Sequence, residues 1–149
     1  MADNDAFLVS TLVTYGAMRD YGEKYNFPLA MQLKNEEVIA SGLASLEIAA
    51  NCGVKIGFGT DLLGELHAHQ NKEFSIRAER QAPIDIIRAA TLVNAEIIGE
   101  SGKLGCIETG AHADLLLLDS SPLDDIDVLA MPQQHVQMVL KASEVVAAA

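Results

Sequence analysis

A lone carboxylate at the end of a short apolar run is the residue of this chain best placed for chemistry. Val54, Ile56 and Phe58 alternate as in a strand, and Thr60-Asp61 follows where the run stops. In parallel sheets flanked by helices, catalytic residues gather at the carboxyl ends of the strands. A carboxylate there can bind a divalent cation and take a proton from a cation-bound water. Alternatively, Asp61 caps the next segment or pairs with a base.

The neighbouring polar residues each allow two interpretations. Thr60 could orient Asp61 through a hydrogen bond, or be an ordinary strand threonine. His67 and His69 would share one face of a strand and could reach one ion. However, they follow the loop-like segment 62–66, and loops at this end of a sheet form the substrate pocket. We therefore expect His67 to face a substrate, with solvent contact as the alternative.

Two further polar groups favour ordinary surface roles. Glu73 and Arg77 are four residues apart, and Arg80 follows three later, a spacing that predicts a helical ion pair on a solvated face. The acids at 124–127 lack the glycine and terminal glutamate of a calcium loop, so they predict a solvated turn.

Composition excludes several classes of protein. The chain has 149 residues, 50% hydrophobic, and a net charge of −11 from 10 basic and 21 acidic residues. That acidity disfavours nucleic acid as a partner. No apolar run is long enough for a membrane span and no leader pattern is present, so we expect a cytoplasmic protein. Two cysteines without metal-ligand spacing predict reduced, structural thiols.

The elements that must position Asp61 follow from the periodicity. Residues 7–14 are apolar and β-branched, as in a buried strand, and a short helix is expected within 15–25. Asn35 resembles an N-cap, and apolar residues then recur at helical spacing up to Gly53. The strand at 54–60 comes next. This order of strand, helix and strand is typical of a parallel βαβ unit.

The pattern of predicted secondary structure changes near residue 100. Before it, helices are predicted at 71–80 and from Pro83 to Gly99. After it, a buried strand is predicted at 113–119 and a hairpin at 136–146. We therefore divide the chain into an α/β part, residues 1–100, and a β-rich part, residues 101–149.

Three motifs together carry a resemblance to a known family: Gly59-Thr60-Asp61, Ala89-Ala90-Thr91, and the glycine-punctuated run from Gly102 to Leu115. In their order and spacing, from Ser10 onward, they resemble the amidohydrolase superfamily of metal-dependent hydrolases. The resemblance is to the branch of imidazolonepropionase-like proteins, prolidases and metallo-carboxypeptidases.

That resemblance implies the C-terminal part of a (β/α)8 TIM-type barrel, with 7–14 as strand seven and 54–61 as strand eight, followed by strands of a small β-sandwich. Asp61 matches the family's strand-eight aspartate, which binds metal and acts as the base, and His67 matches a histidine of the loop over the substrate. The implied cofactor is a divalent metal, with zinc expected and one or two ions in the parent. The implied reaction is hydrolysis of a C–N bond in a dipeptide or N-acyl amino acid.

The family's other metal ligands would precede residue 1. The resemblance therefore implies a fragment of the enzyme that is inactive by itself and binds no metal alone. We expect it to self-associate or to pair with a missing N-terminal part, because excised barrel strands expose unpaired edges. The alternative is a non-catalytic, oligomerising α/β module that kept the fold.

Overall fold

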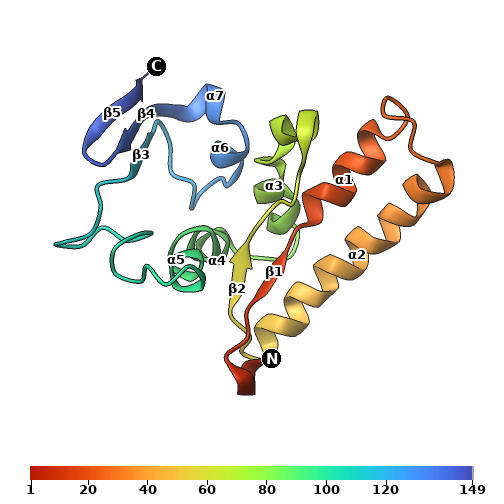
Figure 1. Ribbon diagram of the computed structural model, residues 1–149, viewed down its shortest axis with the longest axis horizontal. Coiled ribbons are helices and arrows are strands. Elements are labelled where there is room, and N and C mark those ends of the chain that lie inside the picture. The colour runs from red at the N-terminus through yellow and green to blue at the C-terminus, as the bar shows by residue number, and fades with distance from the viewer. Residues whose placement is uncertain (149) are drawn as a thin grey trace.

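Two small sheets and a set of helices make up the protein (Figure 1). The computed structural model describes residues 1–148, except for the side chains of Gln32 and Leu33. A short helical turn, η1 (Ala2–Asn4), opens the chain. A parallel pair of strands comes from the first half and an antiparallel sheet of three from the last third. The strands are β1 (Leu8–Ser10), β2 (Ile56–Phe58), β3 (Leu115–Leu118), β4 (Val136–Lys141) and β5 (Glu144–Ala148).

The predicted βαβ unit is confirmed. Strand β1 leads through α1 (Leu12–Tyr21) and α2 (Leu29–Asn51) to β2, and the two strands pair in parallel with Leu8 opposite Ile56. Apolar side chains that include Leu12, Leu46 and Ile56 form a core cluster between the strand pair and α2. Because the two strands are parallel and held by this core, their carboxyl ends lie at the same edge of the sheet.

The strand expected over 7–14 is wrong in its second half, because α1 begins at Leu12. Val13 and Thr14 are buried, as expected, but in the first turn of a helix, whereas Val9 of β1 is exposed. The backbone N–H of Val13 donates to the carboxylate of Glu73 at 2.6 Å. An acceptor in that position satisfies a donor that the first turn of a helix leaves free and complements the helix dipole.

Helix α2 starts six residues before the expected N-cap. It begins at Leu29, directly after Pro28, whose extended backbone ends the preceding turn. Asn35 therefore lies inside the helix and is buried rather than capping it. Good helix formers at 29–34 extend the helix upstream. Its end at Gly53 is as predicted, with the positive φ of 70° that a helix-terminating glycine adopts.

The helices after β2 were largely predicted. A 3₁₀ segment, η2 (Gly64–His69), leads to α3 (Lys72–Ala78), within the expected range. A second helix starts at Pro83, as expected, and runs through three segments to Ile97. Its middle segment is a π-helix, which the periodicity did not indicate. The segments are α4 (Pro83–Arg88), η3 (Ala89–Val93) and α5 (Asn94–Ile97).

The C-terminal third contains the predicted strand, β3, and the predicted hairpin, but the expectation that the strand is buried is wrong, because Leu116 and Leu117 are exposed. Strands β4 and β5 are joined at Ala142 and Ser143, both with positive φ, as tight hairpin turns require. Two short helices, α6 (Asp127–Ala130) and α7 (Pro132–His135), precede β4. Ser75 of α3 donates to Asp127 of α6 at 2.5 Å, which ties this part to the first. No helix within residues 1–148 is long and apolar enough to cross a bilayer.

Candidate functional site

Asp61 lies just beyond the carboxyl end of β2, in a tight backbone turn. Its φ is +51°, in the left-handed region that aspartate tolerates better than most residues. The side chain is exposed. Within residues 1–148 its carboxylate accepts no hydrogen bond and pairs with no base. Neither the capping nor the pairing alternative is seen, and the carboxylate is available to an outside ligand.

The turn that carries Asp61 is held through its backbone. The hydroxyl of Thr14, in the first turn of α1, donates to the carbonyl oxygen of Thr60. The hydroxyl of Thr60 itself has no partner in the described part of the chain. Thr60 therefore contributes its carbonyl, rather than its side chain, to the contacts seen around Asp61.

Glu73 and Arg77 form a buried ion pair, so the expectation of a solvated helix face is wrong. Neither side chain exposes any surface, and Arg77 Nε donates to Glu73 Oε1 at 2.7 Å. The same guanidinium donates to the carbonyl of Gly57 at 3.0 Å and to that of Ser10 at 2.6 Å. The pair therefore joins both strands to α3 at the end of the sheet where Asp61 lies.

Burial and pairing act on Glu73 in opposite directions. Removal from water raises the pKa of Glu73, while Arg77 and the backbone N–H groups of Val13 and Leu12 oppose that rise. The guanidinium also lies 4.8 Å from the centroid of the Phe58 ring. The sequence held one clue to this burial: the apolar Ile76, which is partly buried against the core, shares the helix face of Glu73 and Arg77.

A second anchor of β2 was not predicted. The side-chain amide of Asn94 donates to the carbonyl of Phe58 and accepts its N–H, both at 2.9 Å. Asn94 thus satisfies the backbone of β2 on the edge that faces away from β1. It follows the π-helix η3 directly, and such widened turns often occur at functional sites.

The two neighbouring histidines are placed differently. His67 is exposed on η2, while His69 is partly buried and stacks on the Tyr21 ring with centroids 4.1 Å apart. In a 3₁₀ segment residues three apart share a face, so this pair does not act as two strand histidines would. Across residues 1–148 no group of three or more His, Cys, Asp or Glu side chains could hold a metal ion. The donors of this chain alone do not fit a complete metal centre.

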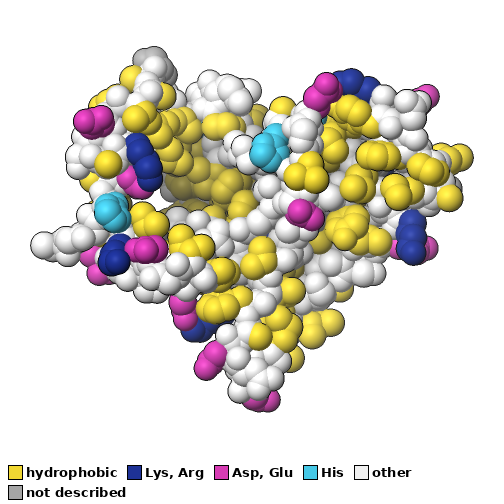
Figure 2. Space-filling model, in the orientation of Figure 1, with side chains coloured by type: hydrophobic (Ala, Val, Ile, Leu, Met, Phe, Trp, Pro, Cys, Tyr) yellow, Lys and Arg dark blue, Asp and Glu magenta, His cyan; other side chains and the backbone are white. Residues whose placement is uncertain are grey.

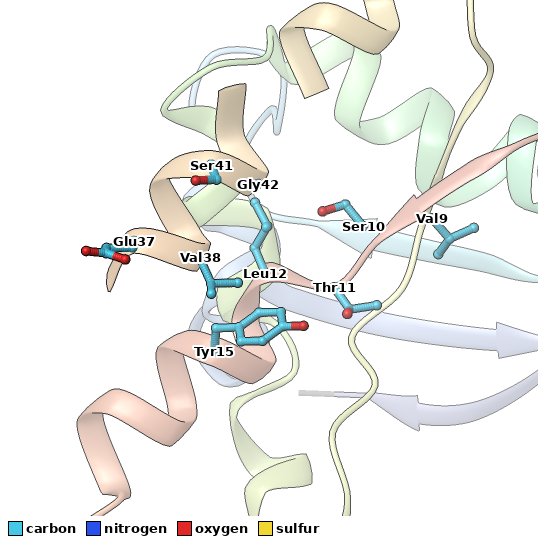
Figure 3. Close-up of a pocket in the computed structure, with 9 residues that line it drawn as sticks. All are labelled: Val9, Ser10, Thr11, Leu12, Tyr15, Glu37, Val38, Ser41 and Gly42. Carbon is cyan, nitrogen blue, oxygen red and sulfur yellow. The ribbon is translucent and has the colours of Figure 1, made fainter. Parts of the chain in front are cut away.

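A cavity of about 500 Å³ opens beside the end of β1, between α1 and α2. In Figure 3, Leu12, Tyr15 and Val38 converge at its centre, whereas Glu37 points away from them. Asp61 is not among the residues that line it. The cavity therefore offers a mixed apolar and hydroxyl-bearing wall, without a catalytic group of the kind expected from the sequence.

Several known proteins are similar to this chain in sequence and fold. A solved prolidase, bound to N-methylphosphonate-L-proline, is 46% identical and superposes with a TM-score of 0.91 over 99% of this chain and 36% of its own. A Xaa-Pro dipeptidase with methionine in its active site is 30% identical, with a TM-score of 0.79 over 97% of this chain and 35% of its own. Ochratoxinase from Aspergillus niger is 29% identical over 67% of this chain and 21% of its own length.

The chain spans about a third of the length of these solved relatives and about a fifth of ochratoxinase. The likeness gives it a TIM-barrel-related α/β fold. The sequence profile of the amidohydrolase family matches residues 10–146, which is nearly the whole chain. This chain therefore belongs to the amidohydrolase family.

Proposed function

We propose that this chain is the C-terminal part of a metal-dependent amidohydrolase that cleaves a C–N bond in a dipeptide or N-acyl amino acid. Residues 1–100 are then the end of the barrel, with β1 and β2 as strands seven and eight, and residues 101–149 belong to the small sandwich. The observation that carries the proposal is the exposed carboxylate of Asp61 at the carboxyl end of β2, which has no partner among the residues that the structure describes.

In this proposal Asp61 is the general base, taking a proton from the attacking water as the water adds to the scissile carbonyl. Its backbone is suited to that role, because Thr14 holds the preceding carbonyl and the Glu73–Arg77 pair holds both strand ends. His67, on the 3₁₀ segment after Asp61, is proposed to contact the substrate. Thr60 positions Asp61.

Asp61 is also proposed as one ligand of a divalent metal, zinc being the ion we would test first. The remaining ligands must come from outside this chain, because the described residues hold no complete set. The isolated chain should therefore contain far less than one metal per molecule. Elemental analysis of the purified protein tests this, and one ion per chain that is lost in Asp61→Asn would contradict it.

A chimera tests the activity itself. The upstream two-thirds of the 46% identical prolidase would be fused to this chain, replacing the equivalent segment. We expect hydrolysis of Xaa-Pro dipeptides or N-acyl amino acids by the chimera. Asp61→Asn should lower kcat by at least ~10²-fold, the usual size of a general-base effect.

Asp124→Asn, another exposed acid, serves as the matched control in the chimera and should leave kcat unchanged. Circular dichroism and gel filtration would first establish that each chimera folds. A folded Asp61→Asn chimera with near-normal kcat would refute the assignment of Asp61. A folded parent chimera without activity would refute the proposed reaction.

The chain's own core supports a second candidate, a non-catalytic α/β module. Buried Leu12, Leu43, Leu46 and Ile56 pack against one another, and the Glu73–Arg77 pair is enclosed within the same part of the chain. A module of this kind would unfold in one cooperative transition when isolated. A fragment that needs its upstream partner would instead aggregate or unfold gradually.

A further inference from the structure

A second cavity, of about 310 Å³, lies between α1, η2 and α3. Its apolar floor is formed by Val13 and Ala17, both buried, with Ile76. Around the mouth lie Arg19, Lys72 and His69. All three elements follow β1 or β2, so the cavity belongs to the loops at the sheet's carboxyl end, where barrel enzymes bind ligands.

Lys72 is the distinctive group at this mouth. Its ammonium donates to the hydroxyl of Tyr21 at 3.2 Å and lies 5.3 Å from the centroid of the same ring. The His69 ring stacks on the same Tyr21 ring. Within residues 1–148 Lys72 has no carboxylate partner, whereas every arginine of the chain has one. An exposed ammonium with free donors therefore lies at the edge of the cavity.

The local charge differs from that of the whole molecule. The chain carries a net charge of −11, which repels anions at long range. Around this mouth, however, Asp20 is the single lining acid, and it pairs with Arg19 at 2.8 Å. Glu36 and Glu79, outside the lining, also act on Arg19. That leaves the ammonium of Lys72 as an uncompensated positive charge above an apolar floor.

We propose that this cavity binds a small organic monocarboxylate with an aliphatic body, its carboxylate held by Lys72 and its apolar group on Val13, Ala17 and Ile76. Free amino acids and N-acyl amino acids belong to this class, so the inference deepens the proposed function. It rests on that function only in taking the ligand to be a substrate or product of the reaction. Binding itself requires no metal and no turnover.

The test is a titration of the isotopically labelled chain with N-acetyl-L-leucine, followed by NMR. N-acetyl-L-leucinamide has the same shape without the charge and is the matched ligand control. We expect saturable shifts around Tyr21, His69 and Ile76 with the acid, and about tenfold weaker binding of the amide, the usual worth of a charge-assisted hydrogen bond. Higher salt should weaken the acid only.

Lys72→Gln should weaken the acid about tenfold on the same grounds. Lys34→Gln provides the variant control, because Lys34 is also exposed and unpaired with acids in the described chain but lies on α2, outside the cavity. Equal binding of acid and amide, equal effects of the two variants, or no saturable shift at millimolar ligand would each overturn the proposal. None of these outcomes bears on Asp61, so the two proposals fail separately.

Discussion

At the scale of single residues, Arg77 joins α3 to the backbone of both β1 and β2. Its guanidinium binds the carbonyls of Ser10 and Gly57 and neutralises Glu73. Arg77→Met would leave three acceptors without their donor, one of them a buried carboxylate. We expect a loss of about 3–5 kcal/mol in the free energy of unfolding, as for other broken buried pairs. Urea unfolding followed by circular dichroism measures it.

Arg80→Met is the control for that experiment. Arg80 lies one turn further along and pairs with Glu47 at 3.4 Å on the exposed surface, so its loss should cost under about 1 kcal/mol. The two variants should also differ in pH dependence. Burial raises the pKa of Glu73, so the penalty of Arg77→Met should grow as pH rises through that pKa and the carboxyl group ionises. Equal losses in both variants would contradict the argument.

Single residues also show how far sequence reasoning reaches at the site. The place of Asp61 could be predicted, because an alternating strand and two glycines mark the carboxyl end of β2 locally. The burial of Glu73 and Arg77 was missed despite the signal from Ile76, since it depends on β1 and β2, which are far apart in the chain. Asn94 was missed for the same reason: its partner, Phe58, is distant in sequence.

At the scale of elements, the presence of each helix or strand was easier to predict than the residues at which it begins and ends. The parallel βαβ unit, α3, the helix after Pro83 and the final hairpin all follow from local periodicity and turn residues. The start of α1 depends instead on a tertiary contact, the carboxylate of Glu73 on the N–H of Val13. The start of α2 was misplaced because Asn35 has N-cap chemistry but the residues before it favour helix.

The hairpin β4–β5 gives a prediction at this scale. Asp114, just before β3, accepts hydrogen bonds from the Lys141 ammonium and from the N–H of Ala142 in the hairpin turn. These bonds, that from Lys141 foremost, lower the pKa of Asp114 below its usual value. The stabilisation is therefore present above the unfolded-state pKa and is lost as pH falls through the lower folded-state pKa.

Asp114→Asn should accordingly lower the urea midpoint at about pH 7, and the difference from the unaltered protein should shrink towards about pH 2. Asp124→Asn removes an exposed acid from the same region and controls for net charge. A difference between Asp114→Asn and the unaltered protein that is constant across this range would show that the ionised carboxylate of Asp114 does not hold the hairpin.

At the scale of the whole molecule, the chain combines a formed core with open edges. Strand β1 pairs only with β2, and β3 is an outer strand of its sheet, among the strands described within residues 1–148. Figure 2 shows hydrophobic side chains over α1 and α2 and in the hollow beside the C-terminal sheet. Leu116 and Leu117 of β3 are 55% and 54% exposed. Such edges and patches favour association.

We therefore expect the purified chain to self-associate, with an average mass by light scattering that falls towards 15.9 kDa on dilution. Leu116→Lys should shift the profile towards monomer, because a charge on an edge strand opposes pairing with another edge. Ile98→Lys adds the same charge at an exposed apolar site outside the strands and should change the profile less. A monomer at every concentration would contradict the expectation that these open edges drive association, and would leave repulsion between copies with a charge of −11 as the opposing force.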